Sequence, residues 1–172
     1  MATFGKTDEG GSTENYYGQL RGWKGNVAEG GTITQVSVYL TSTTYVRVGI
    51  YQGSNPATAE LLWESGSIPH IGDDWEHISV PNVTFDSGGM ILAVAHSEDN
   101  SHVKYDLVSG GGIAKSWTYG SMPDPLNAST SIVQVSVYAT YTPSVSSYTK
   151  TYSADALFKK LGITKSLGAD AA

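Results

Sequence analysis

The sequence predicts an all-β protein, an antiparallel β-sandwich, and three observations lead to this prediction. Apolar and polar residues alternate over several short segments, which is the period of a strand with one buried face. Clusters rich in Gly, Pro, Asn and Asp separate these segments. The chain has 20 Gly and 11 Tyr but only 15% charged residues, a balance typical of β-rich surface domains. We expect about eight to ten strands between residues 2 and 142.

The first two clear strands follow each other closely. TITQVSVYLTS (32–42) places Val36 and Val38 on one face, and TYVRVGIYQG (44–53) alternates in the same way. Because only three residues (42–44) join them, we expect these two strands to pair as a hairpin.

The later strands show the same alternation. It appears in WEHISVP (75–81) and HVKYDL (102–107), whereas GMILAVAHS (89–97) is apolar on both faces, as in a strand at the centre of a sheet. The pentapeptide QVSVY occurs at 35–39 and again at 134–138. We interpret the two copies as strands that meet the same demand, with Val inward and Gln, Ser and Tyr outward.

The chain changes character after residue 142. Residues 143–149 are predicted to form a linker, and residues 150–172 begin a repeat of 15 residues, since KTYSADA recurs as KSLGADA. Within the first copy we expect a short helix from Ser153 to Leu161. A unit this short hides its apolar face only against neighbours, so we expect the array to continue.

Composition limits the possible functions. A net charge of -6, without a basic run, argues against nucleic-acid binding, and the absence of cysteine excludes disulfides and thiolate metal sites. No segment reaches the roughly 18 apolar residues that cross a bilayer. The N-terminus lacks the charged start and apolar stretch of a signal peptide. From the residue balance we expect an extracellular, cell-surface or virion protein.

Several segments between Gly31 and Asp106 are similar to those of a known family of domains: GTITQVSVYL, VRVGIYQGSNPATAELLWES, WEHISV, GGMILAVAHS and VKYD. They resemble jelly-roll domains of bacterial, archaeal and phage-like surface proteins. The tail is similar to the ADALLKKLGITK repeats of long surface or tail proteins. The resemblance implies a jelly roll with a short helical tail, similar to carbohydrate-binding modules, and it brings no catalytic residues. The loop NPATAE (55–60) departs from it, because the expected Pro-Gly is missing.

A glycan site needs aromatic faces that stack on C–H surfaces and polar groups that bind hydroxyls. The candidates are Tyr17, Arg21 and Trp23 on one face of segment 16–25, Trp117 and Tyr119 after a triple glycine, and Lys104 and Asp106, which point outward if Tyr105 points inward. We interpret Trp63 and Trp75 as core or sandwich-edge residues. For Trp23 and Trp117, packing in the core is the alternative to ligand binding.

The densest group of metal-ligand residue types lies in HIGDDWEH, with His70, Asp73, Asp74, Glu76 and His77. A zinc or iron site could use two His and a carboxylate, but Gly-Asp-Asp fits a turn before a strand better. Calcium suits oxygen ligands from loops. The candidates for structural calcium are Asp73 and Asp74, or alternatively Asp8, Glu9 and Glu14 near the N-terminus.

Signatures of catalysis are missing from the sequence. It has no nucleophile elbow, Walker loop or HExxH helix, and a glycosidase pair among the 16 acidic residues stays open. We therefore expect a non-catalytic surface module that recognises a glycan or another extracellular polymer. The alternative is a structural subunit or cap of a virion, tail or filament that binds copies of itself. An enzyme acting on glycosides is the third hypothesis.

Overall fold

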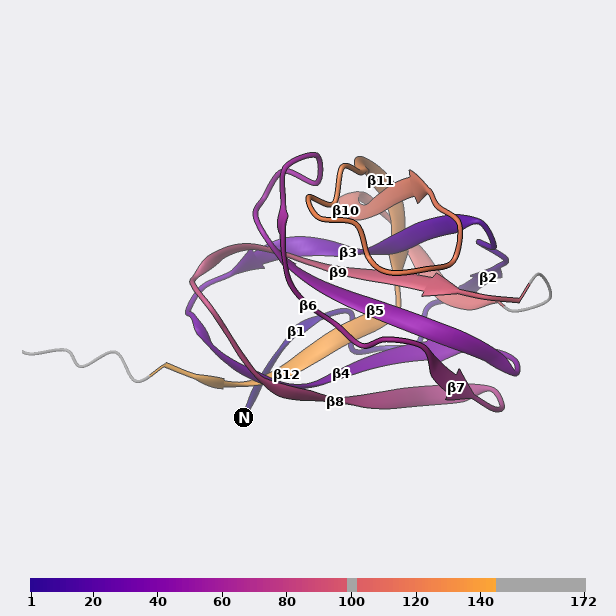
Figure 1. Cartoon of the computed structure of the whole chain (residues 1–172), viewed down its shortest axis with the longest axis horizontal. Coiled ribbons are helices and arrows are strands. Elements are labelled where there is room, and N and C mark those ends of the chain that lie inside the picture. The colour runs from indigo at the N-terminus through magenta and orange to yellow at the C-terminus, as the bar shows by residue number, and fades with distance from the viewer. Residues whose placement is uncertain (99–101, 145–172) are drawn as a thin grey trace, which may run out of the picture.

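The computed structural model describes residues 1–98 and 102–144, and every regular element in these residues is a β-strand (Figure 1). The strands are β1 (Ala2–Gly5), β2 (Ser12–Glu14), β3 (Gln19–Val27), β4 (Gly31–Leu40), β5 (Thr44–Gln52), β6 (Glu60–Glu64), β7 (Ile68–His70), β8 (Asp74–Phe85), β9 (Gly88–His96), β10 (Val103–Ser116), β11 (Ser129–Val135) and β12 (Val137–Pro143). About eight to ten were expected. The difference comes from β1, β2 and β7, which are too short to show an alternation. The predicted helix and repeat array lie outside the described residues.

The strands form two layers. β1, β12, β4 and β8 are neighbours in one layer, and β10, β3, β9, β5 and β6 are neighbours in the other, with β11 beside β10 and β7 beside β5. Val103 of β10 pairs with Leu40 of β4 where the layers meet. The described pairings are antiparallel except that of β11 with β3, so the sheet is mixed and the fold is β-sandwich-like.

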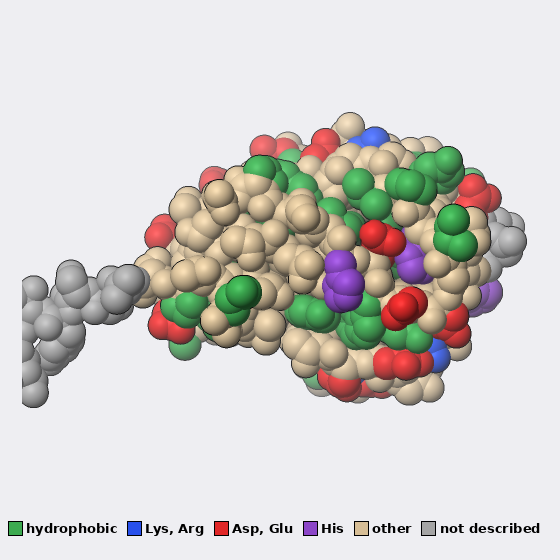
Figure 2. Space-filling view, turned by 90° about the horizontal axis from the view of Figure 1, so that it is seen from below, with side chains coloured by type: hydrophobic (Ala, Val, Ile, Leu, Met, Phe, Trp, Pro, Cys, Tyr) green, Lys and Arg blue, Asp and Glu red, His purple; other side chains and the backbone are tan. Residues whose placement is uncertain are grey.

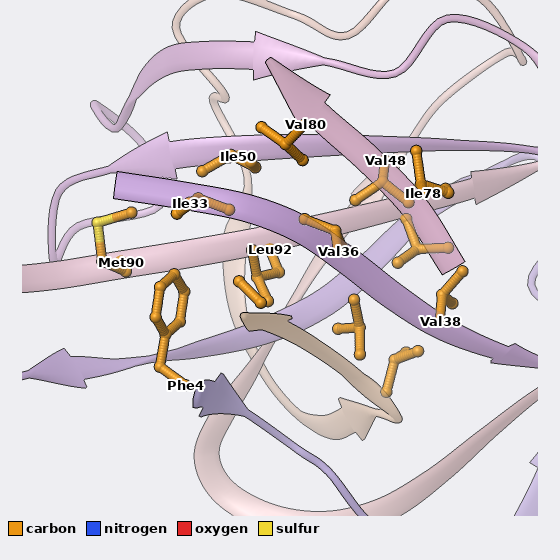
Figure 3. Packing of buried hydrophobic residues seen from close by; sticks show 14 of the residues in the cluster. Phe4, Ile33, Val36, Val38, Val48, Ile50, Ile78, Val80, Met90 and Leu92 are labelled. Atoms are coloured by element: carbon orange, nitrogen blue, oxygen red, sulfur yellow. The ribbon is translucent and has the colours of Figure 1, made fainter. Parts of the chain in front are cut away.

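Aliphatic side chains fill the space between the layers. Figure 3 shows Val36 of β4, Val48 of β5 and Leu92 of β9 meeting in this core, and all three are buried. Trp63 of β6 packs against it as a partly buried residue, as interpreted from the sequence. Full burial of such an aliphatic side chain contributes about 1.5–3 kcal/mol to stability, so this core supplies much of the drive to fold.

The predicted hairpin of β4 with β5 is wrong. β4 pairs with β12 and β8, whereas β5 pairs with β9, β6 and β7, so the two strands lie in different layers. Residues 41–43 carry the chain from one layer to the other. Val38 and Val46 are nevertheless both fully buried. The alternation therefore identifies the buried face of each strand correctly, but it does not determine the neighbouring strand.

A second apolar cluster covers the outer face of the β3–β9–β5 layer. The segment between β10 and β11 (residues 117–128) crosses this face in Figure 1 and supplies Met122 and Leu126, which pack with Tyr51 and Ile91. The Tyr51 hydroxyl donates to the carbonyl of residue 123 at 2.9 Å. Because this segment covers it, β9 is buried on both faces, which confirms the prediction from its sequence.

The two QVSVY copies place their valines inward, as interpreted, but in different settings. The first copy lies within β4, and the second runs from β11 into β12 through Ser136. The Ser136 N–H donates to the carbonyl of Lys104 at 2.9 Å, and its carbonyl accepts from the N–H of Tyr39 at 3.0 Å. Its hydroxyl accepts from the N–H of Gly10 at 2.9 Å. The buried Ser136 thus fixes the point at which the chain changes layers.

Candidate functional site

Lys104 and Asp106, two of the predicted ligand residues, hold the N-terminal segment. Lys6 Nζ lies 2.6 Å from Asp106 Oδ2 and 2.7 Å from Asp8 Oδ2, and Lys104 Nζ lies 2.7 Å from Glu9 Oε1. Burial opposes the charge of Lys6, but the hydrogen bonds to Asp106 and Asp8 outweigh it and raise the pKa of Lys6. The hydrogen bond from Lys6 lowers the pKa of Asp106. Both Lys104 and Asp106 therefore have structural partners.

Trp23 and Tyr119 also contact other parts of the protein. The ring centroid of Trp23 lies 5.7 Å from that of Phe4, and Trp23 packs against the core between the layers. The Tyr119 hydroxyl lies 2.7 Å from Ser67 Oγ, and the guanidinium of Arg47 lies 5.6 Å from the Tyr119 ring centroid. Neither Trp23 nor Tyr119 lines the two hollows that Arg21 and Trp117 line.

Of the remaining three candidates, Tyr17, Arg21 and Trp117, the last two each line an open hollow near β3, β10 and β11. The hollow of Arg21 has a volume of about 470 Å³ and that of Trp117 about 450 Å³, and Ser116 lines both. The lining residues are Gly18, Gln19, Arg21, Ala114, Lys115, Ser116, Trp117, Thr118, Asn127 and Ser129. Tyr17 is exposed and precedes Gly18 in the sequence, but it lines neither hollow. We call the two hollows together the β3–β10–β11 groove.

The register of the three strands sets the order of residues in the groove. Arg21 of β3 lies opposite Ala114 of β10, and Gln19 lies opposite Ser116. Ala114 in turn pairs with Ser129 of β11. Amide, hydroxyl and guanidinium groups from separate parts of the chain are therefore brought side by side, each on a strand with fixed backbone hydrogen bonds.

Arg21 is held from two sides. Its Nη1 donates to Ser131 Oγ at 3.2 Å, and its guanidinium carbon lies 4.6 Å from the ring centroid of Tyr16. Its Nε is buried and has no hydrogen-bond partner within the described part of the chain. The guanidinium is thus oriented by neutral groups, and one of its donors is unsatisfied.

Trp117 lies beside Arg21's hollow, where β10 leads into the covering segment. The backbone N–H of Trp117 donates to the carbonyl of Gly18 at 2.8 Å, and this bond connects the end of β10 to the start of β3. Lys115 Nζ lies 5.2 Å from the indole ring centroid and donates to the carbonyl of Leu126 at 2.8 Å. The indole Nε1 is buried and unpartnered in residues 1–98 and 102–144. Trp117 is partly buried and packs against the second apolar cluster, so the groove combines the accessible part of an aromatic ring with several polar groups.

The acidic and histidine residues proposed as metal ligands are dispersed or paired with one another. Asp73 lies between β7 and β8, and Asp74 is the first residue of β8. Both are exposed, and Asp74 Oδ1 accepts from the backbone N–H of residue 75 at 2.7 Å. His70 Nδ1 lies 3.0 Å from Glu76 Oε2, and the ring of His77 bonds to a serine of β4. Among the residues that the structure describes, no group of three His, Cys, Asp or Glu could hold a metal ion.

The alternative calcium candidates near the N-terminus have partners as well. Asp8 and Glu9 pair with lysine ammonium groups, and Glu14 Oε2 lies 3.0 Å from the hydroxyl of Tyr16 and 3.4 Å from that of Tyr105. One oxygen of each of these carboxylates already accepts from a protein donor, and this competes with coordination of a cation. Structural calcium stays a prediction.

Sequence reasoning missed an aromatic cluster on the outer face of the β12–β4–β8 layer. The Trp75 ring centroid lies 5.3 Å from that of Tyr39 and 5.1 Å from that of Tyr138, both at edge-to-face angles. Beneath it, the buried Ser37 hydroxyl lies 2.7 Å from His77 Nδ1. Figure 2 looks onto the molecule from this side and shows green hydrophobic side chains among acidic and histidine ones. Trp75 therefore lies on an outer surface and is half-buried by its tyrosine neighbours.

Comparison with protein-family models, with curated proteins and with solved structures finds no match to this chain. Within the described residues there is no helix with the length and hydropathy needed to cross a membrane. The fold and the groove together define a β-sandwich-like all-β protein with an open, polar, aromatic-flanked surface site.

Proposed function

We propose that this protein is a non-catalytic surface module, built as a jelly roll, that binds a glycan in the β3–β10–β11 groove. The observation that carries the proposal is that Arg21, Gln19 and Asn127 line one open hollow and Trp117 lines a second, with Ser116 common to both. Amides, hydroxyls and a guanidinium offer the donors and acceptors that sugar hydroxyls need, and an indole offers a face for C–H groups. We place the module outside the cell or on a virion.

The chemistry of the lining supports binding rather than hydrolysis. The groove residues include no carboxylate, histidine or cysteine, so the lining supplies neither the acid pair of a glycosidase nor an activated nucleophile. Its two hollows are open and have Ser116 in common, which suits a segment of an extended chain. Another hollow, of about 430 Å³ beside Tyr45 and Ile71, presents mainly apolar surface and is less suited to sugars.

Trp117→Ala is expected to weaken binding of a retained polysaccharide about tenfold, because the substitution removes the stacking face. The measurement is retardation of the full chain in affinity gels that contain different soluble polysaccharides, with and without calcium. Trp75→Ala makes the same change on the outer face of the other layer and should leave retardation within about twofold. Thermal unfolding of both variants checks that each is folded.

Loss of retardation with Trp75→Ala but not with Trp117→Ala would move the site to the aromatic cluster. If no polysaccharide retards the protein, the glycan proposal fails. The alternative is then a structural subunit that binds copies of itself. Neighbouring exposed side chains of β10 and β11, Leu107, Val108 and Ile132, favour this alternative. Sedimentation at rising protein concentration would reveal it as an increase in mass.

A further inference from the structure

Half of the lysine and arginine side chains in the described part of this acidic protein form ion pairs there, and half do not. The chain has a net charge of -6. Within residues 1–98 and 102–144, Lys6 and Lys104 pair with carboxylates as described above, and Arg47 Nη1 lies 3.5 Å from Glu64 Oε2. The other basic side chains of this part of the chain form no ion pair there: Arg21, Lys24 and Lys115.

Two of the three unpaired cations, Arg21 and Lys115, line the β3–β10–β11 groove. No carboxylate lies among the lining residues of either hollow. Glu14 bonds to the Tyr16 hydroxyl, whose ring lies beside Arg21, but it makes no ion pair with Arg21 in the described structure. The groove is therefore a positively charged surface on a negatively charged protein.

The contacts of both cations orient them without neutralising them. Arg21 is held by the ring of Tyr16 and a serine hydroxyl, and Lys115 by a backbone carbonyl and the ring of Trp117. A guanidinium presents its N–H groups as a planar fork that matches a carboxylate or sulfate, and a lysine ammonium adds a point charge. Two oriented cations in a groove that also carries hydroxyl and amide groups fit a sugar chain with anionic substituents.

We infer that the groove selects an anionic polysaccharide, with Arg21 and Lys115 binding its carboxylate or sulfate groups. This inference rests on the proposed function, because it names the class of glycan for that site. The net charge of the whole protein would repel such a polymer, so any attraction has to come from a local concentration of unpaired positive charge. The groove supplies this charge.

The test compares retardation of the full chain by a neutral glucan, a polyuronate and a sulfated polysaccharide. We expect at least one of the two acidic polymers to retard the protein, and its affinity to fall about tenfold or more between 50 and 500 mM salt. Retention by the polyuronate alone or by the sulfated polymer alone identifies the anionic group. Lys115→Gln and Arg21→Gln should each weaken binding about tenfold.

Lys24→Gln is the matched control, because Lys24 is an unpaired cation that does not line the groove. It should change affinity less than about twofold. Lys115→Arg retains the charge and should bind within about threefold of the unmodified protein, which separates the role of charge from a loss of folding.

Three outcomes would overturn the inference. Retention by the neutral glucan alone, insensitive to salt but lost with Trp117→Ala, would uphold the glycan site and refute its anionic preference. Equal losses of affinity with Lys24→Gln and Lys115→Gln would show that the polymer is attracted by positive charge in general and not bound at the groove. Retention by none of the polymers would overturn the inference together with the proposed function.

Discussion

Leu92→Ala is expected to lower the free energy of unfolding by about 3–5 kcal/mol, the largest effect of any single substitution considered for this protein. Leu92 is fully buried at the centre of β9, opposite Trp23 of β3 and Ile50 of β5. The site has little room to collapse around a smaller side chain. β3 approaches β9 so closely that a Cβ on Gly22 would collide with the carbonyl oxygen of Leu92. Urea unfolding followed by fluorescence measures the change.

Leu107→Ala is the matched control, because the same atoms are removed from a residue that is 66% exposed. It should change the free energy of unfolding by less than about 0.5 kcal/mol. Similar losses for the two variants would contradict the position of Leu92 between the layers.

Leu126→Ala is expected to cost about 2–4 kcal/mol and also to weaken ligand binding. Leu126 is fully buried under the covering segment 117–128. Its N–H donates to the carbonyl of Ala59 at 3.0 Å, and its carbonyl accepts from Lys115 Nζ. Loosening of this residue would therefore disturb both Lys115 and the adjacent Asn127 of the groove. Amide hydrogen exchange reports the local change, and gel retardation reports the change in binding.

Faster exchange should be confined mainly to residues 117–128 and the ends of β10 and β11. If the affinity is unchanged in a variant whose residues 117–128 exchange faster, ligand binding in the groove does not depend on the covering segment. An unchanged free energy of unfolding would show that Leu126 does not pack as described.

The sequence predicts the β-rich class and the buried faces well, because both depend on local alternation. The inward positions of Val36, Val38 and Val48 follow from a period of two, whatever the neighbours of each strand. The pairing of strands depends instead on contacts between distant segments. The short connection at 41–43 favours a hairpin, yet burial of Val38 and Val46 in the common core is satisfied equally well when the chain changes layers.

The candidate site was partly predictable for the same reason. Arg21 and Trp117 have the right chemistry, and each stands near a glycine-containing segment that lets strands approach closely. Lys104 and Asp106 have similar chemistry, but their partners come from the N-terminal segment, far away in the sequence. The hydroxyl and amide groups of Gln19, Asn127 and Ser129 lack a distinctive pattern. The register of β3, β10 and β11 brings Gln19 and Ser129 together, and the end of the covering segment adds Asn127.

The aromatic cluster was missed because its members come from three strands. Tyr39 and Tyr138 end the two QVSVY copies, and outward tyrosines were expected there. Trp75 is the second residue of β8, where a tryptophan is usually a sign of core or edge packing. The pairing of β8 with β4, and of β4 with β12, places Trp75 between the two tyrosines.

The most direct test of the central claim is a titration of the isotope-labelled full chain with an oligosaccharide of the retained acidic polymer, followed by amide NMR shifts. Binding in the β3–β10–β11 groove predicts the largest shifts at the amides of Gly18, Arg21, Ser116, Asn127 and Ser129. Shifts concentrated on the outer face of the β12–β4–β8 layer, or no shifts at concentrations that saturate retardation, would contradict it.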